Sequence, residues 1–371
     1  MKTKITILLC LCLMSNLLKA QTSDDLLNLM IGKKLISQED ADSIRADAAL
    51  KAQEAKEKQK TFTISAKRPI AITGYTQVRF QSLQESGKVD YADVRRARLD
   101  VRGNVVPTWE YRVQFDLAAS PKLLDGYTVF KPFDFFKLEA GQFKIPFSME
   151  NLAQSNNMET IDRSQVVEAL TSRSRDILGN NNGRDVGVQA FGSILKIKDR
   201  FIIDYFVGGF NGNGINTADN NEPKDAVARI VFHPVKGLDI GGSWYNGYDK
   251  YGTPVARNHV RTRVGGELSY IYKIASLKGE YIEGEDGGIK RSGYYAQLAS
   301  YIYKKKFQLV FKYDAFDQDT DKDDDATINY VGGINFFFND YAKIQVNATI
   351  RTEETKNVNN DIIGVQLQVG F

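Results

Sequence analysis

Three arginines at nearby positions form the sequence pattern that most directly suggests a chemistry. Arg96, Arg98 and Arg102 share one face of an alternating segment, and residues two apart on a strand face lie roughly 6.8 Å from each other. Guanidinium groups stay charged and present planar donors that suit phosphate or carboxylate. We therefore expect a ladder along which a small anion exchanges one arginine for the next. Three further residues could extend this ladder: Arg112, Arg261 and Arg263.

A structural role is the alternative for the same arginines. Acidic residues occur close to them in the pattern, at Asp100, Glu110, Asp116 and Glu267. These carboxylates could pair with the guanidinium groups and only rigidify the wall that carries them. The sequence leaves both roles open.

The elements that must position these side chains are strands with a period of two residues. From about residue 70 apolar and polar residues alternate, most clearly over residues 341–351 and 363–371. About sixteen such strands fit between residues 70 and 371, and short connections alternate strictly with long ones. This alternation is typical of outer-membrane barrels, which have tight periplasmic turns and longer external loops. We therefore predict an all-β protein, a transmembrane antiparallel β-barrel of about 16 strands, rather than a soluble sandwich.

Proline positions and the last residue support the barrel. All 8 prolines fall before the first strand or in connections, as expected because proline cannot donate to an interior ladder. The final alternating segment ends on the aromatic Phe371, as outer-membrane barrels commonly do. In this register Arg95 falls on the outer face, and we expect it to reach lipid phosphate at the membrane rim.

The longest predicted connection covers residues 144–183. A loop of this length in a compact barrel is usually functional, and a barrel of about sixteen strands leaves an aqueous lumen. We predict that this loop folds into the lumen as a constriction; an external flap over the mouth is the alternative. The loop region mixes the basic Lys144, Arg163, Arg173, Arg175 and Arg184 with the acidic Glu150, Glu159, Asp162, Glu168, Asp176 and Asp185.

The amino-terminal residues differ from the barrel. Residues 1–20 combine the basic Lys2 and Lys4 with an apolar run and a small residue at Ala20, which predicts a secretory signal peptide. We predict a periplasmic helical or coiled arm over residues 21–61, with a short apolar helix that ends near Gly32, and a porin barrel over residues 62–371. The arm is either a flexible lead-in or a contact with a partner that would bury its apolar positions.

Composition and charge exclude several functional classes. The chain has 371 residues with a formal net charge of +3, and removal of the three signal-peptide lysines would leave 46 basic residues against 46 acidic ones, so nothing indicates nucleic acid as a partner. Both cysteines lie in the signal segment, and only 2 histidines are present, so we expect no metal, no cofactor and no enzyme. Alternate aspartates from Asp317 resemble the start of a calcium loop, but Lys322 and Ile328 replace its required glycine and glutamate.

Several motifs resemble the phosphate-selective porin O and P family. The resemblance covers roughly residues 70–371 and implies a 16-stranded trimeric outer-membrane porin that conducts anions, with phosphate or polyphosphate preferred. It also implies anion-selecting roles for Arg96, Arg98 and Lys144. The motifs are Val94-Arg-Arg-Ala-Arg-Leu, Tyr111-Arg-Val-Gln-Phe-Asp-Leu, Gly141-Gln-Phe-Lys-Ile-Pro-Phe-Ser-Met-Glu and Phe210-Asn-Gly-Asn-Gly.

Together these observations predict an outer-membrane porin for passive diffusion of small solutes, in particular anions such as phosphate. Its expected partners are outer-membrane lipid, small anions and further copies of itself in a homotrimer. The alternatives are a non-selective diffusion porin and a closed barrel that serves as an envelope anchor or adhesin. The expected pore-lining residues are Arg96, Arg98, Arg102, Arg112, Lys144, Arg261 and Arg263.

Overall fold

The computed structural model describes residues 27, 30–33, 35, 37, 62–63, 70–303, 305–355 and 358–371. The chain divides into two compact units, residues 1–60 and 61–371. In the first unit residue 27 and residues 30–32 are helical. The predicted signal peptide and most of the predicted arm over residues 21–61 lie outside the described residues.

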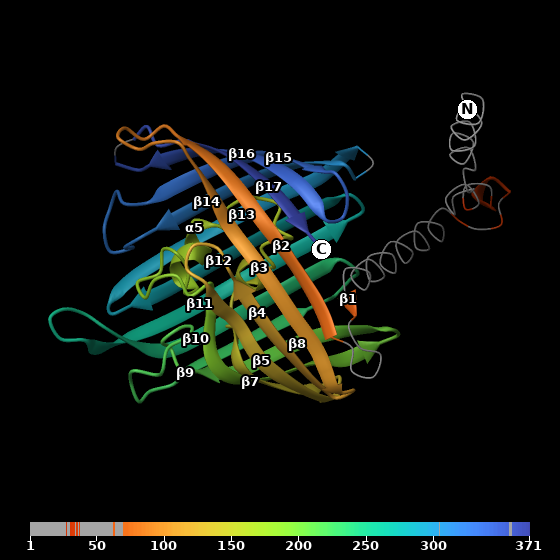
Figure 1. The fold of residues 1–371 in the computed structure, drawn as a ribbon, viewed down its shortest axis with the longest axis horizontal. Helices are drawn as coiled ribbons and strands as arrows, with labels where there is room; N and C mark the ends of the chain where they lie inside the picture. Colours follow the sequence, from red (N-terminus) through yellow and green to blue (C-terminus); the bar gives the residue numbers. More distant parts are fainter. Residues whose placement is uncertain are drawn as a thin grey trace, which may run out of the picture. The chain divides into compact units, whose positions relative to one another are not determined.

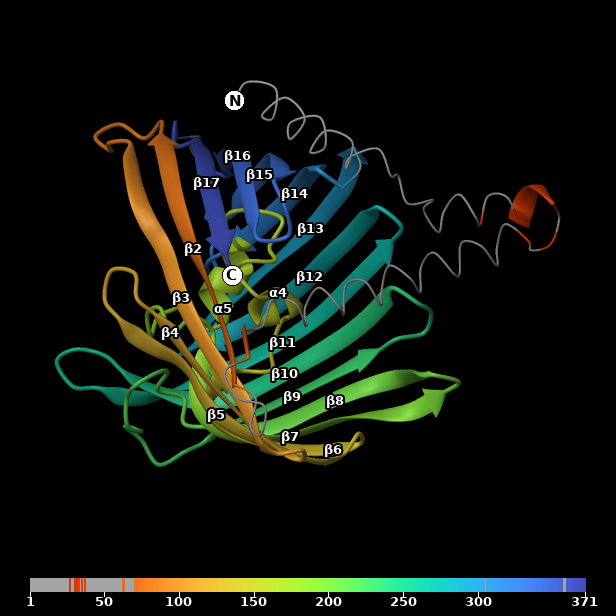
Figure 2. The same ribbon diagram turned by 45° about the vertical axis from the view of Figure 1, so that its right-hand side comes forward.

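The second unit contains a closed antiparallel barrel of 16 strands, β2 to β17, as predicted (Figures 1 and 2). Closure comes from pairing of the last strand with β2, where Gly370 lies opposite Tyr75. A short strand, β1 (Phe62–Thr63), pairs with the start of β2. The barrel strands are β2 (Ile70–Leu83), β3 (Tyr91–Val106), β4 (Trp109–Asp116), β5 (Lys122–Phe133), β6 (Phe136–Lys144), β7 (Arg184–Ile197), β8 (Arg200–Phe210), β9 (Asp225–Phe232), β10 (Leu238–Tyr251), β11 (Arg257–Tyr272), β12 (Ala275–Asp286), β13 (Ile289–Tyr303), β14 (Phe307–Asp317), β15 (Thr327–Phe337), β16 (Ala342–Glu353) and β17 (Ile362–Gly370).

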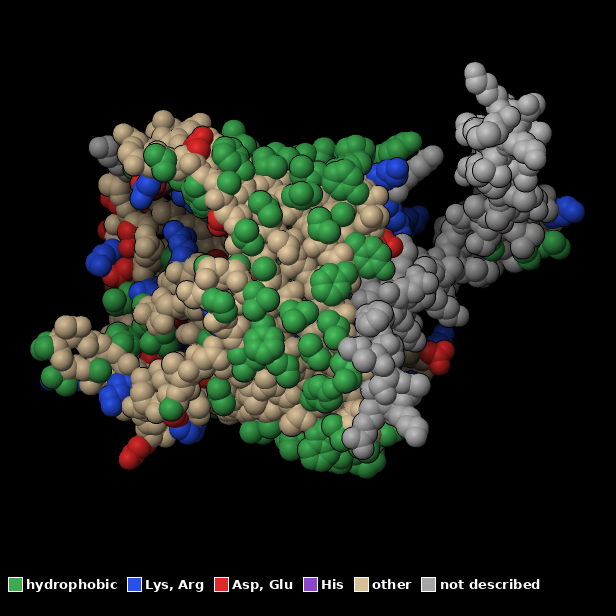
Figure 3. All heavy atoms as spheres, viewed as in Figure 1, with side chains coloured by type: hydrophobic (Ala, Val, Ile, Leu, Met, Phe, Trp, Pro, Cys, Tyr) green, Lys and Arg blue, Asp and Glu red, His purple; other side chains and the backbone are tan. Residues whose placement is uncertain are grey.

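Apolar side chains cover the outside of the barrel and polar ones cover its inside. In β17 the outward Ile363 and Leu367 are 52% and 43% exposed, whereas the inward Gln366 is 1% exposed. Figure 3 shows hydrophobic side chains distributed over the outer wall, while charged side chains gather towards the ends of the barrel. This confirms the predicted two-sided strands, because only lipid outside and water or polar loop inside would stabilise both faces.

The connections alternate in length only in part. Links of two to five residues follow β3, β5, β7, β9, β11, β13 and β15, and links of five to 39 residues follow the other strands except β12. The links after β4 and β10 have five residues each, no more than the link after β9. The predicted strict alternation requires a long link between β12 and β13, and this was wrong: the link is a two-residue turn of Gly287 and Gly288. Both glycines have positive φ, which a two-residue hairpin of this kind requires. No helix among the described residues is long and apolar enough to cross a membrane.

The longest connection lies inside the barrel. It joins β6 to β7 and contains α4 (Met149–Leu152) and α5 (Gln165–Leu170). Figures 1 and 2 show α5 surrounded by the strands of the barrel. The loop therefore enters the lumen, as predicted, and is not an external flap.

Candidate functional site

The lumenal loop, residues 145–183, is fixed to one side of the barrel by an apolar cluster. Phe147, Val166 and Leu170 of the loop are almost fully buried and pack with Phe210 of β8 and Ile282 of β12. Burial of such side chains is the main stabilising contribution to loop docking. One side of the loop thus faces the β8–β14 wall, and its other side is left to line the pore.

Glycines on the inner wall make room for this packing. A Cβ atom on Gly293 would lie 2.9 Å from Cβ of Val166, and one on Gly364 would lie 3.2 Å from Cδ1 of Ile161. At Gly293 both Val166 and the backbone oxygen of Ala315 on β14, 2.6 Å away, would have to shift. At Gly364 the flexible end of Ile161 would have to move by a few tenths of an ångström. These inward glycines therefore act as sockets for apolar side chains of the loop.

Polar contacts fix the two helical turns of the lumenal loop. The backbone N–H groups of Met149 and Glu150 donate to Glu280 of β12 at 3.0 and 2.7 Å. The Glu150 carboxylate accepts from Lys312 Nζ at 2.9 Å and from the hydroxyl of Ser164 at 2.7 Å. Burial raises the pKa of Glu150, but the Lys312 ammonium and the Ser164 hydrogen bonds outweigh it and hold this pKa below its usual range. Glu150 is therefore ionised and clamps α4, the start of α5 and β14 together.

The open side of the lumenal loop faces a basic cavity of about 660 Å³. Its walls are the loop, β2 to β5 with the link between β4 and β5, and β14 to β17. Nine lysines or arginines and four aspartates or glutamates line it. The nine cations are Arg79, Arg95, Arg96, Lys122, Arg163, Arg173, Arg175, Lys312 and Arg351.

Four of these guanidinium groups bind neutral partners. Arg96 donates to Gln77 Oε1 at 2.8 Å, Arg173 to Asn151 Oδ1 at 2.9 Å, and Arg175 to Gln165 Oε1 at 2.7 Å. Arg163 donates to the backbone oxygen of Glu150 at 3.1 Å. Within the part of the chain that the structure describes, no ion pair joins any of the four to a carboxylate. Their positive charge is therefore available to a solute in the cavity.

The pKa of Arg173 reflects this crowding of cations. Burial lowers the pKa of Arg173 well below the usual value, and the neighbouring Arg163 lowers it further. Both effects disfavour the charged form, so the cluster would be stabilised by an anion. The guanidinium groups nevertheless stay protonated, because arginine does not lose its proton in proteins.

The predicted arginine row of β3 divides into three environments. Arg96 lines the cavity, as described. Arg98 is buried, with its Nε 3.2 Å from Asp116 Oδ2 and its Nη1 3.4 Å from Ser155 Oγ of the loop. Arg102 is exposed and lies 3.6 Å from Asp100. The three guanidinium groups therefore do not form one continuous ladder in the cavity.

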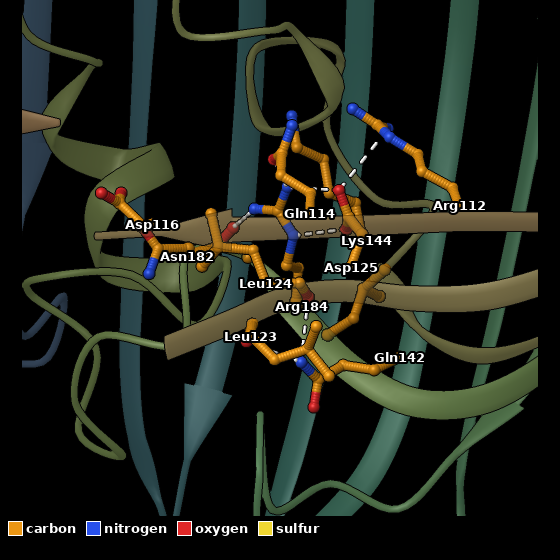
Figure 4. Close-up of polar contacts among 12 residues, drawn as sticks. Arg112, Gln114, Asp116, Leu123, Leu124, Asp125, Gln142, Lys144, Asn182 and Arg184 are labelled. Atoms are coloured by element: carbon orange, nitrogen blue, oxygen red, sulfur yellow. Dashed lines mark hydrogen bonds and ion pairs between the residues drawn. The ribbon is translucent and has the colours of Figure 1, made fainter. Parts of the chain in front are cut away.

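Arg112 belongs to a network on the wall beside the cavity (Figure 4). It pairs with Asp100, and its Nη1 lies 3.5 Å from Asp125 Oδ2. Asp125 also binds Nε of Arg184 at 2.6 Å. The sequence placed Arg184 in the loop, but it begins β7 and shares this carboxylate, so the network ties β4, β5 and β7 together.

The lumenal loop is held by the side chains of Lys144, Arg261 and Arg263. Lys144 Nζ donates to the backbone oxygens of Leu152 and Ala153 at 2.9 and 2.7 Å. Arg261 forms ion pairs with two buried aspartates, Asp176 and Asp249. Arg263 is 1% exposed and pairs with Asp286 at 2.6 Å. Each cation contacts protein groups, although the buried Nε of Arg261 has no hydrogen-bond partner, and none of the three lines the cavity.

Arg95 was predicted to point outward, and this was wrong. The register shifts between Gln77 and Val78 of β2, which are paired with Arg96 and Val94, so Arg95 is the extra residue of a β-bulge. Its guanidinium donates to the backbone oxygen of Ile161 at 2.7 Å and pairs with Asp162, both in the lumenal loop. The bulge therefore adds a second cation beside Arg96.

Comparisons with known proteins agree with this architecture. A search of curated proteins finds no match. Among solved structures, the chain is similar in fold to a trimer form of OmpT, an outer membrane protein of Vibrio cholerae, with 13% identity, a TM-score of 0.61 and coverage of 82% of this chain and 99% of that one. The outer membrane channel DcaP of Acinetobacter baumannii has 11% identity, a TM-score of 0.61 and coverage of 84% and 99%. OmpF of Salmonella typhi has 10% identity, a TM-score of 0.60 and coverage of 84% and 100%.

The closed barrel and its loop-narrowed polar lumen define the class of outer-membrane channel proteins. Within this class, the family model of the phosphate-selective porins O and P matches residues 72–251 and assigns this part of the chain to that family. The family and the fold support a porin role and an outer-membrane location, and they indicate a channel rather than an enzyme.

Proposed function

We propose that this protein is a passive porin that favours small anions, phosphate among them. The observation that carries the proposal is the group of four guanidinium groups without carboxylate partners, Arg96, Arg163, Arg173 and Arg175, in a cavity lined by nine cations and four carboxylates. A confined aqueous space lined by one sign of charge concentrates ions of the opposite sign. The neutral partners keep the guanidinium groups in place without cancelling their charge.

Arginine chemistry favours oxyanions in particular. A guanidinium can offer two parallel N–H donors to phosphate or carboxylate, whereas a halide accepts them with less geometric fit. The cations come from opposite walls, with Arg96 on β3 and Arg163 and Arg173 on the lumenal loop. A phosphate could pass between them without binding tightly to any single group, which conduction requires.

The cellular setting is part of the same proposal. Residues 1–20 serve as a signal peptide, residues 21–61 form a periplasmic arm, and the barrel assembles as a homotrimer in the outer membrane. The trimer form of OmpT from Vibrio cholerae supports the assembly by analogy of fold. Crosslinking of the purified protein in mild detergent tests it, and a species of one chain only would contradict it.

Single-channel recording in a planar bilayer tests the proposed function. Reversal potentials in a potassium chloride gradient should show a chloride permeability above that of potassium, and millimolar phosphate should reduce the chloride current. A ratio equal to that of the bulk ion mobilities would instead favour a general diffusion porin. A folded protein without conductance would favour an envelope anchor or adhesin.

A further inference from the structure

Two phenylalanines stand on the water-facing side of the barrel wall. Phe191 of β7 and Phe206 of β8 are direct cross-strand partners. Their ring planes are parallel within 4°, and their centroids lie 5.8 Å apart. The adjacent Val207 on β8 is 57% exposed on the lipid side, so Phe206 points inward. Both rings are half-buried in a polar lumen, so contact with lipid does not explain why phenylalanines occur at these positions.

The lumenal loop does not account for these rings. β8 begins at Arg200, after the short turn, and ends at Phe210, which is buried in the apolar cluster under the loop. Phe206 lies four residues before Phe210 and is outside that cluster, as is Phe191. The pair therefore lines the lumen between the short turns and the lumenal loop.

A cation flanks the pair on each side. Lys137 of β6 is paired with Phe191, and Arg229 of β9 with Phe206, so four consecutive strands contribute one row. Lys137 Nζ lies 5.6 Å from the Phe191 centroid, and Arg229 Cζ lies 5.5 Å from the Phe206 centroid, each over the ring. Arg229 is neutralised by Glu267, with Nε 3.1 Å from Oε1. Lys137 forms no ion pair with the described carboxylates and retains its charge.

The row defines the chemistry of a solute. An aromatic ring has a negative face and a positive edge, and here the cations lie over the faces, which leaves the edges for the lumen. A solute with its own π-face can place that face against the two edges, while its carboxylate reaches Lys137. A saturated ring of equal size and charge lacks the negative face.

We propose that the row Lys137–Phe191–Phe206–Arg229 is a binding subsite for planar aromatic carboxylates on the short-turn side of the constriction. The inference rests on the proposed porin function, since the solute must reach the lumen. It names a substrate class that the basic cavity alone does not select, because that cavity has arginines but no aromatic side chain among its lining residues.

Block of the chloride current by two matched probes tests the subsite. Benzoate and cyclohexanecarboxylate share charge and size and differ in the π-face. The half-blocking concentration of benzoate should be about three- to tenfold lower in the unmodified channel, as one or two aromatic contacts allow. The double variant Phe191→Leu/Phe206→Leu keeps apolar volume and should reduce this difference to less than about twofold.

Control variants separate the ring effect from charge and from general damage. Lys137→Gln should weaken block by both probes alike. Phe133→Leu/Phe135→Leu removes another parallel ring pair, 5.0 Å apart and exposed at a short turn, and should leave the difference intact. Heat-modified mobility on gels confirms that each barrel is folded.

Two results would overturn the inference while the porin function stands: equal block by the two probes in the unmodified channel, or an unchanged difference in the leucine double variant. A folded protein that carries no chloride current would overturn the porin function, and the subsite with it.

Discussion

Replacement of Arg96 by alanine isolates the contribution of one unpaired charge to ion selectivity. Arg96 donates to the neutral Gln77, so its removal leaves no carboxylate without a partner. Gln77 keeps a hydrogen bond to Gln368 at 2.8 Å. The variant should therefore fold normally, and a change in the current can be attributed to the lost charge.

The size of the effect follows from the dimensions of the basic cavity. A volume of about 660 Å³ corresponds to an equivalent radius of about 5 Å, so an ion at the centre lies about 7 Å from a wall guanidinium. At this separation in water two unit charges interact by about 0.6 kcal/mol. In the Arg96→Ala channel a permeating anion loses this attraction, and a permeating cation loses a repulsion of equal size. Ionic screening halves both interaction energies at about 0.1 M salt. The anion/cation permeability ratio should fall about threefold at 0.1 M salt and about fivefold at 0.01 M.

Reversal potentials of Arg96→Ala at the two salt concentrations provide the measurement. Lys322→Ala is the matched control, because it removes the same charge from an exposed external loop, where Lys322 pairs with Asp319. The control ratio should stay within experimental error of the unmodified channel. An Arg96→Ala ratio equal to that of the control, or a decrease that does not depend on salt, would refute the electrostatic reasoning.

Three further substitutions test how the lumenal loop and its wall are held together. Arg98→Met leaves the buried Asp116 without its cation, and should lower the free energy of unfolding by about 3 to 5 kcal/mol, measured as a shift in the thermal transition of the barrel. Gly293→Leu fills a socket of the loop, and should raise single-channel conductance and current noise as the loop is displaced. Glu150→Gln removes the carboxylate that binds Lys312, and should raise current noise at pH 7. The pKa of Glu150 is lower in the folded protein than in the unfolded chain. The contacts of the ionised Glu150 therefore stabilise the loop fully above the unfolded pKa of about 4.3, and they are lost as the pH falls through the lowered folded value. The unmodified channel should thus become noisy only below about pH 4.

The sequence was sufficient to predict the barrel because its signal is local and repeated. Each strand carries its own alternation, and an error in one segment leaves the others unaffected. The number of strands, the inward polar face of β16 and the entry of the long loop into the lumen were all accessible in this way. The two-residue turn after β12 was missed because the glutamate and glycine residues near it have the composition of a loop.

The arrangement of the candidate site was less accessible, because it depends on single-residue shifts and distant contacts. Arg95 is itself the extra residue of the bulge, which places it in the lumen instead of on the lipid side. The alternation of residue types in β3 does not predict this bulge. Arg98 differs from Arg96 because its guanidinium contacts Asp116 on the next strand and Ser155 in the lumenal loop. The residue types and their spacing along the sequence predict neither of these two contacts.

The distribution of charge is the basis of the proposed anion preference in a nearly neutral chain. The full sequence has 49 basic and 46 acidic residues, which by itself indicates no preference. Many acidic residues of the inner wall are buried with a cation, as Asp249 is with Arg261 and Asp286 with Arg263. These pairs hold the loop and contribute little field at the cavity, where cations outnumber carboxylates nine to four. The proposed selectivity therefore depends on which cations are left with neutral partners. Exchange of Gln77 beside Arg96 for glutamate should reduce the anion/cation permeability ratio as effectively as removal of Arg96 itself.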